Sequence, residues 1–128
     1  MAGEAFNAKQ GLVIVSARIF GPSGDTLARL AVDTGALTTL VDPRILTSVG
    51  YDVAQAPGQA RLVSASGILT VPRLLAEKVT ALGQERTYLP IIAHTLPPAT
   101  GVDGVLALDF YRARRLTVNF RRGRVSLA

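Results

Sequence analysis

Residues 29–41, RLAVDTGALTTLV, place a single carboxylate between two apolar runs. The run before it ends at Val32, the break is Asp33-Thr34-Gly35, and apolar residues return at 37–41. Burying an ionised aspartate costs several kcal/mol unless the group is paired or hydrogen-bonded. Asp33 is therefore either satisfied by hydrogen bonds within a turn or held there to take part in a reaction.

Length and composition indicate a small globular protein. The chain has 128 residues, 48% hydrophobic and 18% charged, which excludes the disordered class and fits one domain. We expect a flexible N-terminal segment over 1–10 and a single domain over 11–128. The absence of Cys and the single His94 argue against a disulfide framework and a zinc site. We also expect a cytoplasmic protein without a signal peptide or membrane segment, or else a fragment of a longer tethered protein.

The pattern along the chain predicts short strands separated by turns. Strands are expected at 12–20, 27–32, 37–41, 61–63, 68–71, 79–82, 87–93, within 102–110, at 116–120 and around 125–127. Asp42-Pro43 and Gly50 bracket a short helix over 44–49, and one helical turn is expected near the end of 102–110. The inward positions of the last two strands are expected to be Leu116, Val118, Phe120, Val125 and Leu127. The fold class is therefore all-β, a small closed barrel with one or two short helices.

The net charge of +5 comes from the end of the chain. Basic and acidic residues balance before Asp109, and the excess is carried by Arg112, Arg114, Arg115, Arg121, Arg122 and Arg124. Clustered arginines are compatible with nucleic-acid binding. We favour a role in protecting edge strands from pairing with other chains, because no aromatic residues alternate with the arginines as single-strand recognition requires.

Together these features resemble the retropepsin-like aspartic proteases, and in particular their single-domain, bacterial-type branch. The resemblance spans roughly 12–127 and includes the Asp-Thr-Gly-Ala at 33–36, the apolar run after it, a small-residue hairpin, and DGVLALDF at 103–110. Asp-Thr-Gly alone is a weak signal. Its place after a strand, ahead of the hairpin and the 103–110 motif, makes the resemblance specific.

The resemblance implies a catalytic role for Asp33, Thr34 and Gly35. The Thr34 hydroxyl would lock the loop to its counterpart, and Gly35 would let backbone approach the carboxylate closely. Peptide hydrolysis needs two carboxylates, one as general base and one as general acid. Because only one Asp-Thr-Gly is present, the second carboxylate must come from another copy, which implies a homodimer. The pair shares one proton, so activity should favour acidic pH; no metal or cofactor is implied.

The same resemblance implies a flap over 61–71 that covers an extended, mostly apolar peptide. The expected substrate-binding residues are Ala31, Ala36, Val63, Ser64, Ala65, Ser66, Gly67, Ile68, Val102 and Val105. An ordinary surface hairpin is the alternative for the flap, and plain core is the alternative for Ala31, Ala36, Val102 and Val105.

Several positions depart from the family pattern. Ala107 stands where glycine is usual, and Tyr111 stands where leucine is usual. Viral members support their dimer with an Asp–Arg pair, whose positions here are Leu37 and Leu108. Viral dimers also interleave both chain ends, and residues 124–128 are a candidate for such a strand.

Three other functions are compatible with the sequence. A catalytically inactive barrel of the same fold could serve as a dimerisation or peptide-binding module. Nucleic-acid binding through the C-terminal arginines, which we do not expect, would weaken steeply with salt. A serine hydrolase built on Ser66 and His94 is the weakest alternative, because SASG lacks the first glycine of a nucleophile elbow.

Overall fold

The glycine-bounded turn after residue 20 folds the first long apolar segment back on itself. The computed structural model describes residues 3–128 and their side chains other than that of Ser64. Strand β2 spans Ile14–Gly21 and β3 spans Gly24–Val32, paired antiparallel from Gly21↔Gly24. Gly24 has a φ of 146°, which residues with a Cβ rarely adopt. The other strands are β1 (Glu4–Ala5), β4 (Thr39–Val41), β5 (Gly58–Ser64), β6 (Gly67–Ala81), β7 (Gln84–Ala93), β8 (Gly104–Leu106), β9 (Leu116–Asn119) and β10 (Arg124–Leu127).

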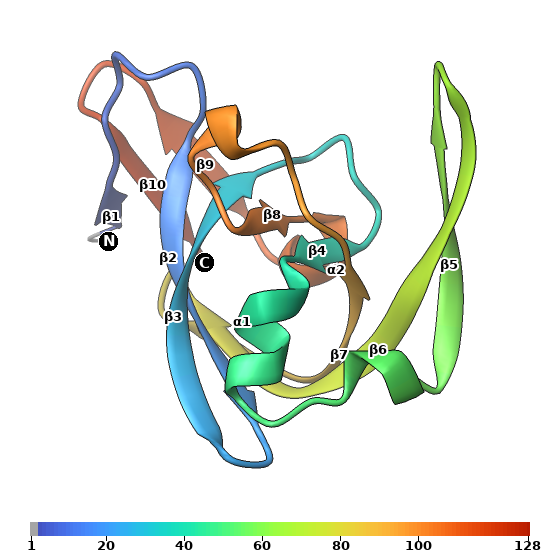
Figure 1. Cartoon of the computed structure of the whole chain (residues 1–128). Helices are drawn as coiled ribbons and strands as arrows, with labels where there is room; N and C mark the ends of the chain where they lie inside the picture. The colour runs from blue at the N-terminus through green and yellow to red at the C-terminus, as the bar shows by residue number, and fades with distance from the viewer. Residues whose placement is uncertain (1–2) are drawn as a thin grey trace.

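Six strands close into a barrel, as the sequence predicts. Their order is β2-β3-β8-β4-β7-β6, and β6 pairs back onto β2 (Figure 1). The β3–β8 and β4–β7 pairs are parallel, and the other four pairs are antiparallel. The parallel β3–β8 pair brings the end of β3, where Asp33 follows, beside the end of β8. The β3–β8 pairing therefore brings together the Asp-Thr-Gly-Ala motif at 33–36 and the motif at 103–110, which lie far apart in the sequence.

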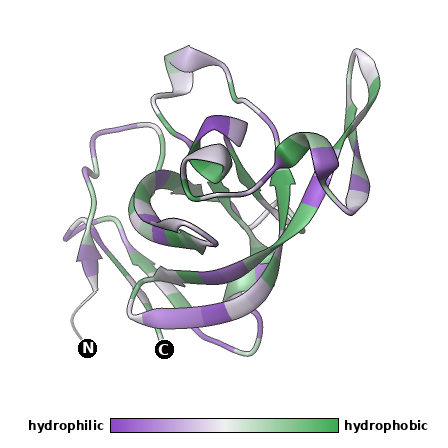
Figure 2. Cartoon of the chain, turned by 60° about the horizontal axis from the view of Figure 1, so that its bottom comes forward, coloured by the Kyte–Doolittle hydropathy of each residue, from purple (hydrophilic) through white to green (hydrophobic). Residues whose placement is uncertain are grey.

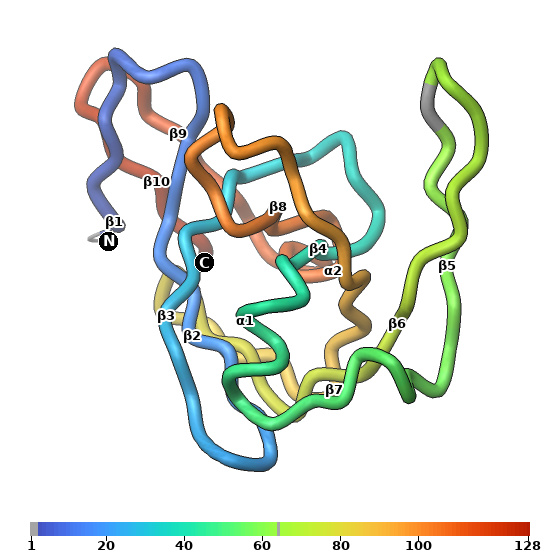
Figure 3. The backbone as a smooth tube through the Cα atoms, in the orientation of Figure 1, coloured from blue at the N-terminus to red at the C-terminus, as the bar shows by residue number. Residues whose placement is uncertain are grey.

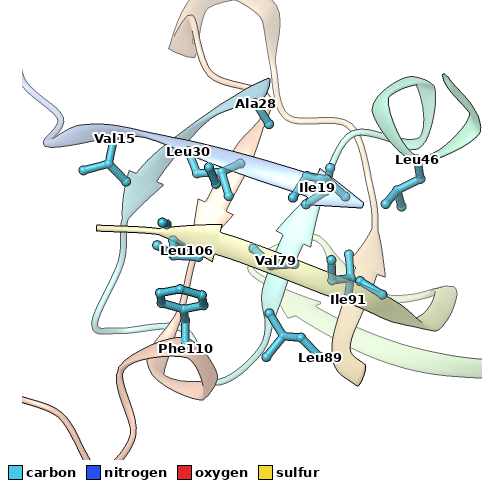
Figure 4. Packing of buried hydrophobic residues seen from close by; sticks show 14 of the residues in the cluster. Val15, Ile19, Ala28, Leu30, Leu46, Val79, Leu89, Ile91, Leu106 and Phe110 are labelled. Atoms are coloured by element: carbon cyan, nitrogen blue, oxygen red, sulfur yellow. The ribbon is translucent and has the colours of Figure 1, made fainter. Parts of the chain in front are cut away.

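Alternating side chains of the barrel strands fill its interior. Along β2, for example, Val15, Ala17 and Ile19 are buried, and Ser16 between the first two is exposed. Hydrophobic and hydrophilic residues accordingly mix along the strands in Figure 2. Figure 4 shows the resulting core, which takes residues from the first hairpin, α1, β6, β7, β8 and α2: Val15, Ile19, Ala28, Leu30, Leu46, Val79, Leu89, Ile91, Leu106 and Phe110.

One strand is longer than predicted. Segments 68–71 and 79–82, expected to be separate strands, are joined in the continuous β6, which runs over Gly67–Ala81. Pro72 lies between them, and a proline usually weakens a strand because it has no N–H to donate. At Pro72, β6 has only β5 as a neighbour, because its pairing with β7 begins at Arg73. Pro72 is therefore tolerated, since one side of the strand needs no N–H donor there. We call residues 58–73 the projecting hairpin, because it extends beyond the barrel (Figure 1).

Residues 3–128 contain two α-helices, both short. Helix α1 (Pro43–Ser48) starts one residue before the predicted helix, and the Asp42 side chain caps it by accepting a hydrogen bond from the Arg44 N–H. Helix α2 (Leu108–Tyr111) is the predicted helical turn. Two 3₁₀ turns, η1 (Val53–Gln55) and η2 (Pro98–Thr100), lie in connecting segments. In residues 3–128, no helix has the length and apolar character needed to cross a membrane.

A second sheet, in the order β1-β10-β9, lies beside the barrel. Val125 and Leu127 of β10 are buried, as predicted. The prediction that Phe120 faces inward is wrong: β9 ends at Asn119, and the Phe120 side chain is 63% exposed. Its ring instead packs edge-on against Phe6, with the centroids 5.7 Å apart. Residues 1–2 of the segment expected to be flexible lie outside the described residues; its Glu4–Ala5 form β1.

Candidate active site

Asp33 follows directly on β3 and is held by hydrogen bonds on both sides. Its N–H donates to the Leu106 carbonyl at 3.0 Å, and its Oδ1 accepts from the Gly35 N–H at 2.9 Å. The side chain is half-buried. A Cβ placed on Gly35 would lie 3.2 Å from that same Oδ1, which is tighter than ordinary contact. Glycine at 35 thus allows the close approach of backbone to carboxylate that the resemblance implies.

The segment after β8 is hydrogen-bonded to the Asp33 loop and to the start of β4. The Leu108 N–H donates to the Ala36 carbonyl at 3.0 Å, which ties the start of α2 to the loop. The Thr39 hydroxyl, fully buried, donates to Asp109 Oδ1 at 2.7 Å and accepts from the Ala107 N–H at 3.2 Å. The Thr39 N–H also donates to Asp109 Oδ2 at 3.1 Å. These contacts hold the segment 33–39 and the motif at 103–110 together.

Sequence reasoning did not assign Thr39 or Asp109 to the site. The signal was present, since each is a polar residue inside an otherwise apolar motif, but the pairing depends on barrel closure across seventy residues. Ala107, which stands where the resemblance implies glycine, is fully buried. Its N–H is among the hydrogen bonds just described, so the extra methyl group is accommodated without losing the loop contact.

A groove of about 710 Å³ opens next to Asp33, between the 33–38 segment and the projecting hairpin. Figure 3 shows the projecting hairpin standing apart from the barrel, across from the 33–38 segment in cyan. Five of the predicted site residues line this groove: Asp33, Gly35, Ala36, Val63 and Val105. The remaining lining residues are Leu37, Thr38, Leu40, Ala60, Arg61, Leu62, Ile92 and Leu96. Apolar side chains predominate, and Asp33 is the only acid among them.

The other predicted substrate-binding residues lie elsewhere. Ala31 is only 4% exposed and belongs to the barrel wall. Val102 lies in the loop before β8 and is not among the groove-lining residues. Ala65, Ser66, Gly67 and Ile68 are exposed at or beside the tip of the projecting hairpin and are not among the groove-lining residues. Ser64 is part of β5, but its side chain lies outside the described residues.

The apolar floor of the groove was missed. Leu40, Ile92 and Val71 form a small buried cluster against which Leu62 and Leu96 pack. These residues come from β4, β6, β7 and their neighbours, so only the folded barrel brings them together. Leu37, a large apolar residue two positions after Gly35, also lines the groove and remains 69% exposed.

Thr34 faces a different hollow. This hollow, about 440 Å³ in volume, is lined by Thr34, Leu108, Tyr111, Arg112, Ala113, Arg114 and Leu116. The Thr34 side chain is exposed, and its hydroxyl has no hydrogen-bond partner in the part of the chain that the structure describes. Tyr111 is buried here and its O–H donates to the Leu106 carbonyl at 2.9 Å. Burial, and then the negative charges of Asp33 and Asp109, raise the pKa of Tyr111.

Comparison with known proteins identifies the fold. No family model matches the chain, and a search of curated proteins finds no match. Among solved structures, the chain is similar to a retropepsin-like aspartic protease from Rickettsia conorii. The TM-score is 0.69 at 14% sequence identity, with 97% of this chain and 94% of that chain covered. The chain therefore has a retropepsin-like all-β barrel fold, as the sequence resemblance implies.

Proposed function

We propose that this protein is an aspartic endopeptidase that works as a homodimer, with two copies of Asp33 activating a water molecule. The observation that carries the proposal is the Asp33 carboxylate, held by the Gly35 N–H at the base of an apolar groove. One carboxylate of the pair would take a proton from the water while the other donates a proton to the scissile carbonyl oxygen. The similarity to a retropepsin-like aspartic protease supports the same conclusion.

The second carboxylate must come from another molecule. Among the described residues that line the groove, Asp33 is the only acid, and Asp109 is already bonded to Thr39. Thr34 points its exposed side chain into the neighbouring hollow, where a partner's loop would meet it. A two-fold axis beside Thr34 would place the two Asp33 carboxylates opposite each other.

Strand pairing narrows where the partner could add to the second sheet. Residues 124–128 were a candidate for an interleaved strand, but β10 already pairs with β9 along its length and with β1 at Val125 and Arg124. In the described part of the chain, the outer edge of β9 is unpaired, and Leu116 of β9 lines the same hollow as Thr34. We therefore place the partner along the face formed by Thr34, α2 and β9.

The groove suits an extended apolar segment of peptide. Leu37, Leu62 and Val63 offer apolar contacts on its two sides. Strand β5 is the terminal strand of the seven-stranded sheet order, so one of its edges has backbone groups available for an added strand. An unfolded or flexible protein segment would supply the matching extended backbone.

Cleavage of a mixed peptide library tests the proposal. We expect the protein to cleave peptides between apolar residues, with highest activity at the acidic end of a range from about pH 4 to 7, where the pair keeps one proton. Asp33→Asn should abolish cleavage while the circular dichroism spectrum stays unchanged. If the wild-type protein forms dimers and binds peptides but cleaves none over that range, the inactive-module alternative is correct instead.

A further inference from the structure

We propose that Tyr111 is a positioning residue for Asp33, acting through the carbonyl of Leu106. This inference rests on the proposed function for its kinetic consequences, and on the geometry alone for its structural ones. The Leu106 carbonyl accepts two hydrogen bonds, from the Asp33 N–H at 3.0 Å and from the Tyr111 O–H at 2.9 Å. One oxygen atom thus connects the tyrosine to the backbone of the proposed catalytic residue.

The tyrosine is itself held firmly. Only 5% of Tyr111 is exposed, and its ring packs edge-on against Phe110 with the centroids 6.2 Å apart. Phe110 is fully buried in the barrel core. The phenol therefore has little freedom to leave the Leu106 carbonyl, and the hydrogen bond links the core to the Asp33 loop.

Burial, and then the charged surroundings, raise the pKa of Tyr111 and keep its hydroxyl protonated as a donor. The carboxylates of Asp33 and Asp109 act on the phenol from the loop and from α2, and both disfavour a negative charge on its oxygen. Arg86, from β7, directs its guanidinium to the carbonyls of Phe110 and Arg112 instead. Since the phenol stays protonated, the link to Leu106 holds at every pH at which the enzyme is expected to work.

Tyr111 also borders the hollow that contains Thr34. A partner seated in that hollow would press on the ring whose hydroxyl holds the Leu106 carbonyl. Tyr111 therefore lies between the proposed dimer face and the Asp33 loop. Leucine, which the resemblance implies at this position, would provide packing but no hydrogen bond.

Tyr111→Phe removes the hydroxyl and keeps the ring. One hydrogen bond is worth about 0.5–1.5 kcal/mol, so we expect kcat to fall about three- to tenfold. KM should change little, because Tyr111 does not line the groove. The bell-shaped pH profile should narrow, because two carboxyl groups held less closely interact less strongly.

Tyr51→Phe is the matched control. The Tyr51 hydroxyl donates to the Phe20 carbonyl at 2.6 Å and accepts from the Glu77 N–H at 2.7 Å, at a site apart from Asp33. This variant should lose stability but keep the wild-type kcat and pH profile. Equal kcat and equal profile width in Tyr111→Phe and the wild type would overturn the proposal.

Amide hydrogen exchange tests the same proposal without activity. In Tyr111→Phe, the Asp33 N–H should exchange about three- to tenfold faster relative to amides of the β2–β3 hairpin, and in Tyr51→Phe it should not. If the wild type cleaves no peptide, the proposed function fails, while faster exchange at Asp33 still supports the positioning role. Unchanged relative exchange at Asp33 would refute that role even in an active enzyme.

Discussion

The identity of residue 35 is dictated by the Asp33 carboxylate. An added Cβ would lie 3.2 Å from Asp33 Oδ1, so the carboxylate would have to move by a few tenths of an ångström. Gly35→Ala should therefore lower kcat for peptide cleavage by up to ~100-fold, because small displacements of a reacting group are costly in rate. The melting temperature should change little, since residue 35 is exposed.

Gly11→Ala provides the comparison for this substitution. A Cβ at Gly11 would have no atom within 4 Å, so this variant should keep both its activity and its melting temperature. The argument from close approach is wrong if Gly35→Ala cleaves peptides as fast as Gly11→Ala does.

Thr39 contributes mainly to stability. Its buried hydroxyl satisfies both Asp109 Oδ1 and the Ala107 N–H. Thr39→Val keeps the shape but leaves these groups without the hydroxyl, so the free energy of unfolding should fall by roughly 1–3 kcal/mol. Urea denaturation measures the loss, and Thr39→Ser, which keeps the hydroxyl, should recover most of it. Equal stability of the Val and Ser variants would show that the hydroxyl contributes nothing.

At the scale of single elements, the N-terminus of α1 gives the chain an acid-sensitive contact. Hydrogen bonding from the Arg44 side chain lowers the pKa of Asp42, which is 6% exposed. A lowered folded-state pKa stabilises the fold above the unfolded value of about 3.9, and this contribution disappears as pH falls through the folded-state pKa. Asp42→Ala should therefore cost about 1 kcal/mol near neutral pH, mostly through the lost cap, and less below about pH 4.

Asp52→Ala is the control for the cap. Asp52 precedes η1 but its side chain makes no capping hydrogen bond, and it is exposed. Thermal melts of both variants across the acidic range should show a pH-dependent difference from wild type only for Asp42→Ala. A cost that does not change with pH would mean that the carboxylate charge of Asp42 is irrelevant.

Local sequence signals predicted most of the elements, and their failures have identifiable causes. Alternation and turn residues located the first hairpin, and Asp42-Pro43 located α1, because those signals act over a few residues. The continuity of β6 through Pro72 depends on which neighbour pairs there. Phe120 keeps the alternation of β9 but lies past its end, where Phe6 becomes available as a partner.

The candidate site likewise has local features that were predicted and long-range features that were not. The arrangement of Asp33 and Gly35 is local, and the resemblance carried by residues 33–36 and 103–110 implied it. The apolar cluster of Leu40, Ile92 and Val71 at the groove floor was not predicted, because these residues meet only when the barrel closes. The Tyr111–Leu106–Asp33 connection likewise requires the parallel pairing of β3 with β8.

At the scale of the whole molecule, the open outer edges of β5 and β9 lie at different places. Strand β5 ends the seven-stranded sheet order beside the groove, and β9 ends the second sheet beside the Thr34 hollow. An edge strand offers unpaired backbone groups to an incoming strand. Under the proposed function, β5 would be available to a peptide and β9 to a second copy, so both could bind at once.

The electrostatics of the Thr34 hollow determine how a dimer should respond to salt. Arg112 and Arg114 line the hollow, and no ion pair joins them to an acid within residues 3–128. Two copies meeting there would bring four guanidinium groups together, and their repulsion would be screened by salt. Raising NaCl from about 0.05 to about 0.5 M should therefore tighten the dimer, as measured by sedimentation equilibrium.

The double variant Arg112→Gln/Arg114→Gln should dimerise more tightly at low salt and respond less to added salt. Arg121→Gln/Arg122→Gln removes the same charge from the turn between β9 and β10, at the opposite end of these strands from the hollow, and should keep the wild-type response. A dimer that loosens as salt is added would place the partner on another face. A protein that stays monomeric at every salt concentration, even with a saturating hydroxyl-bearing peptide analogue of the transition state, would leave Asp33 without its second carboxylate and remove the basis for proteolysis.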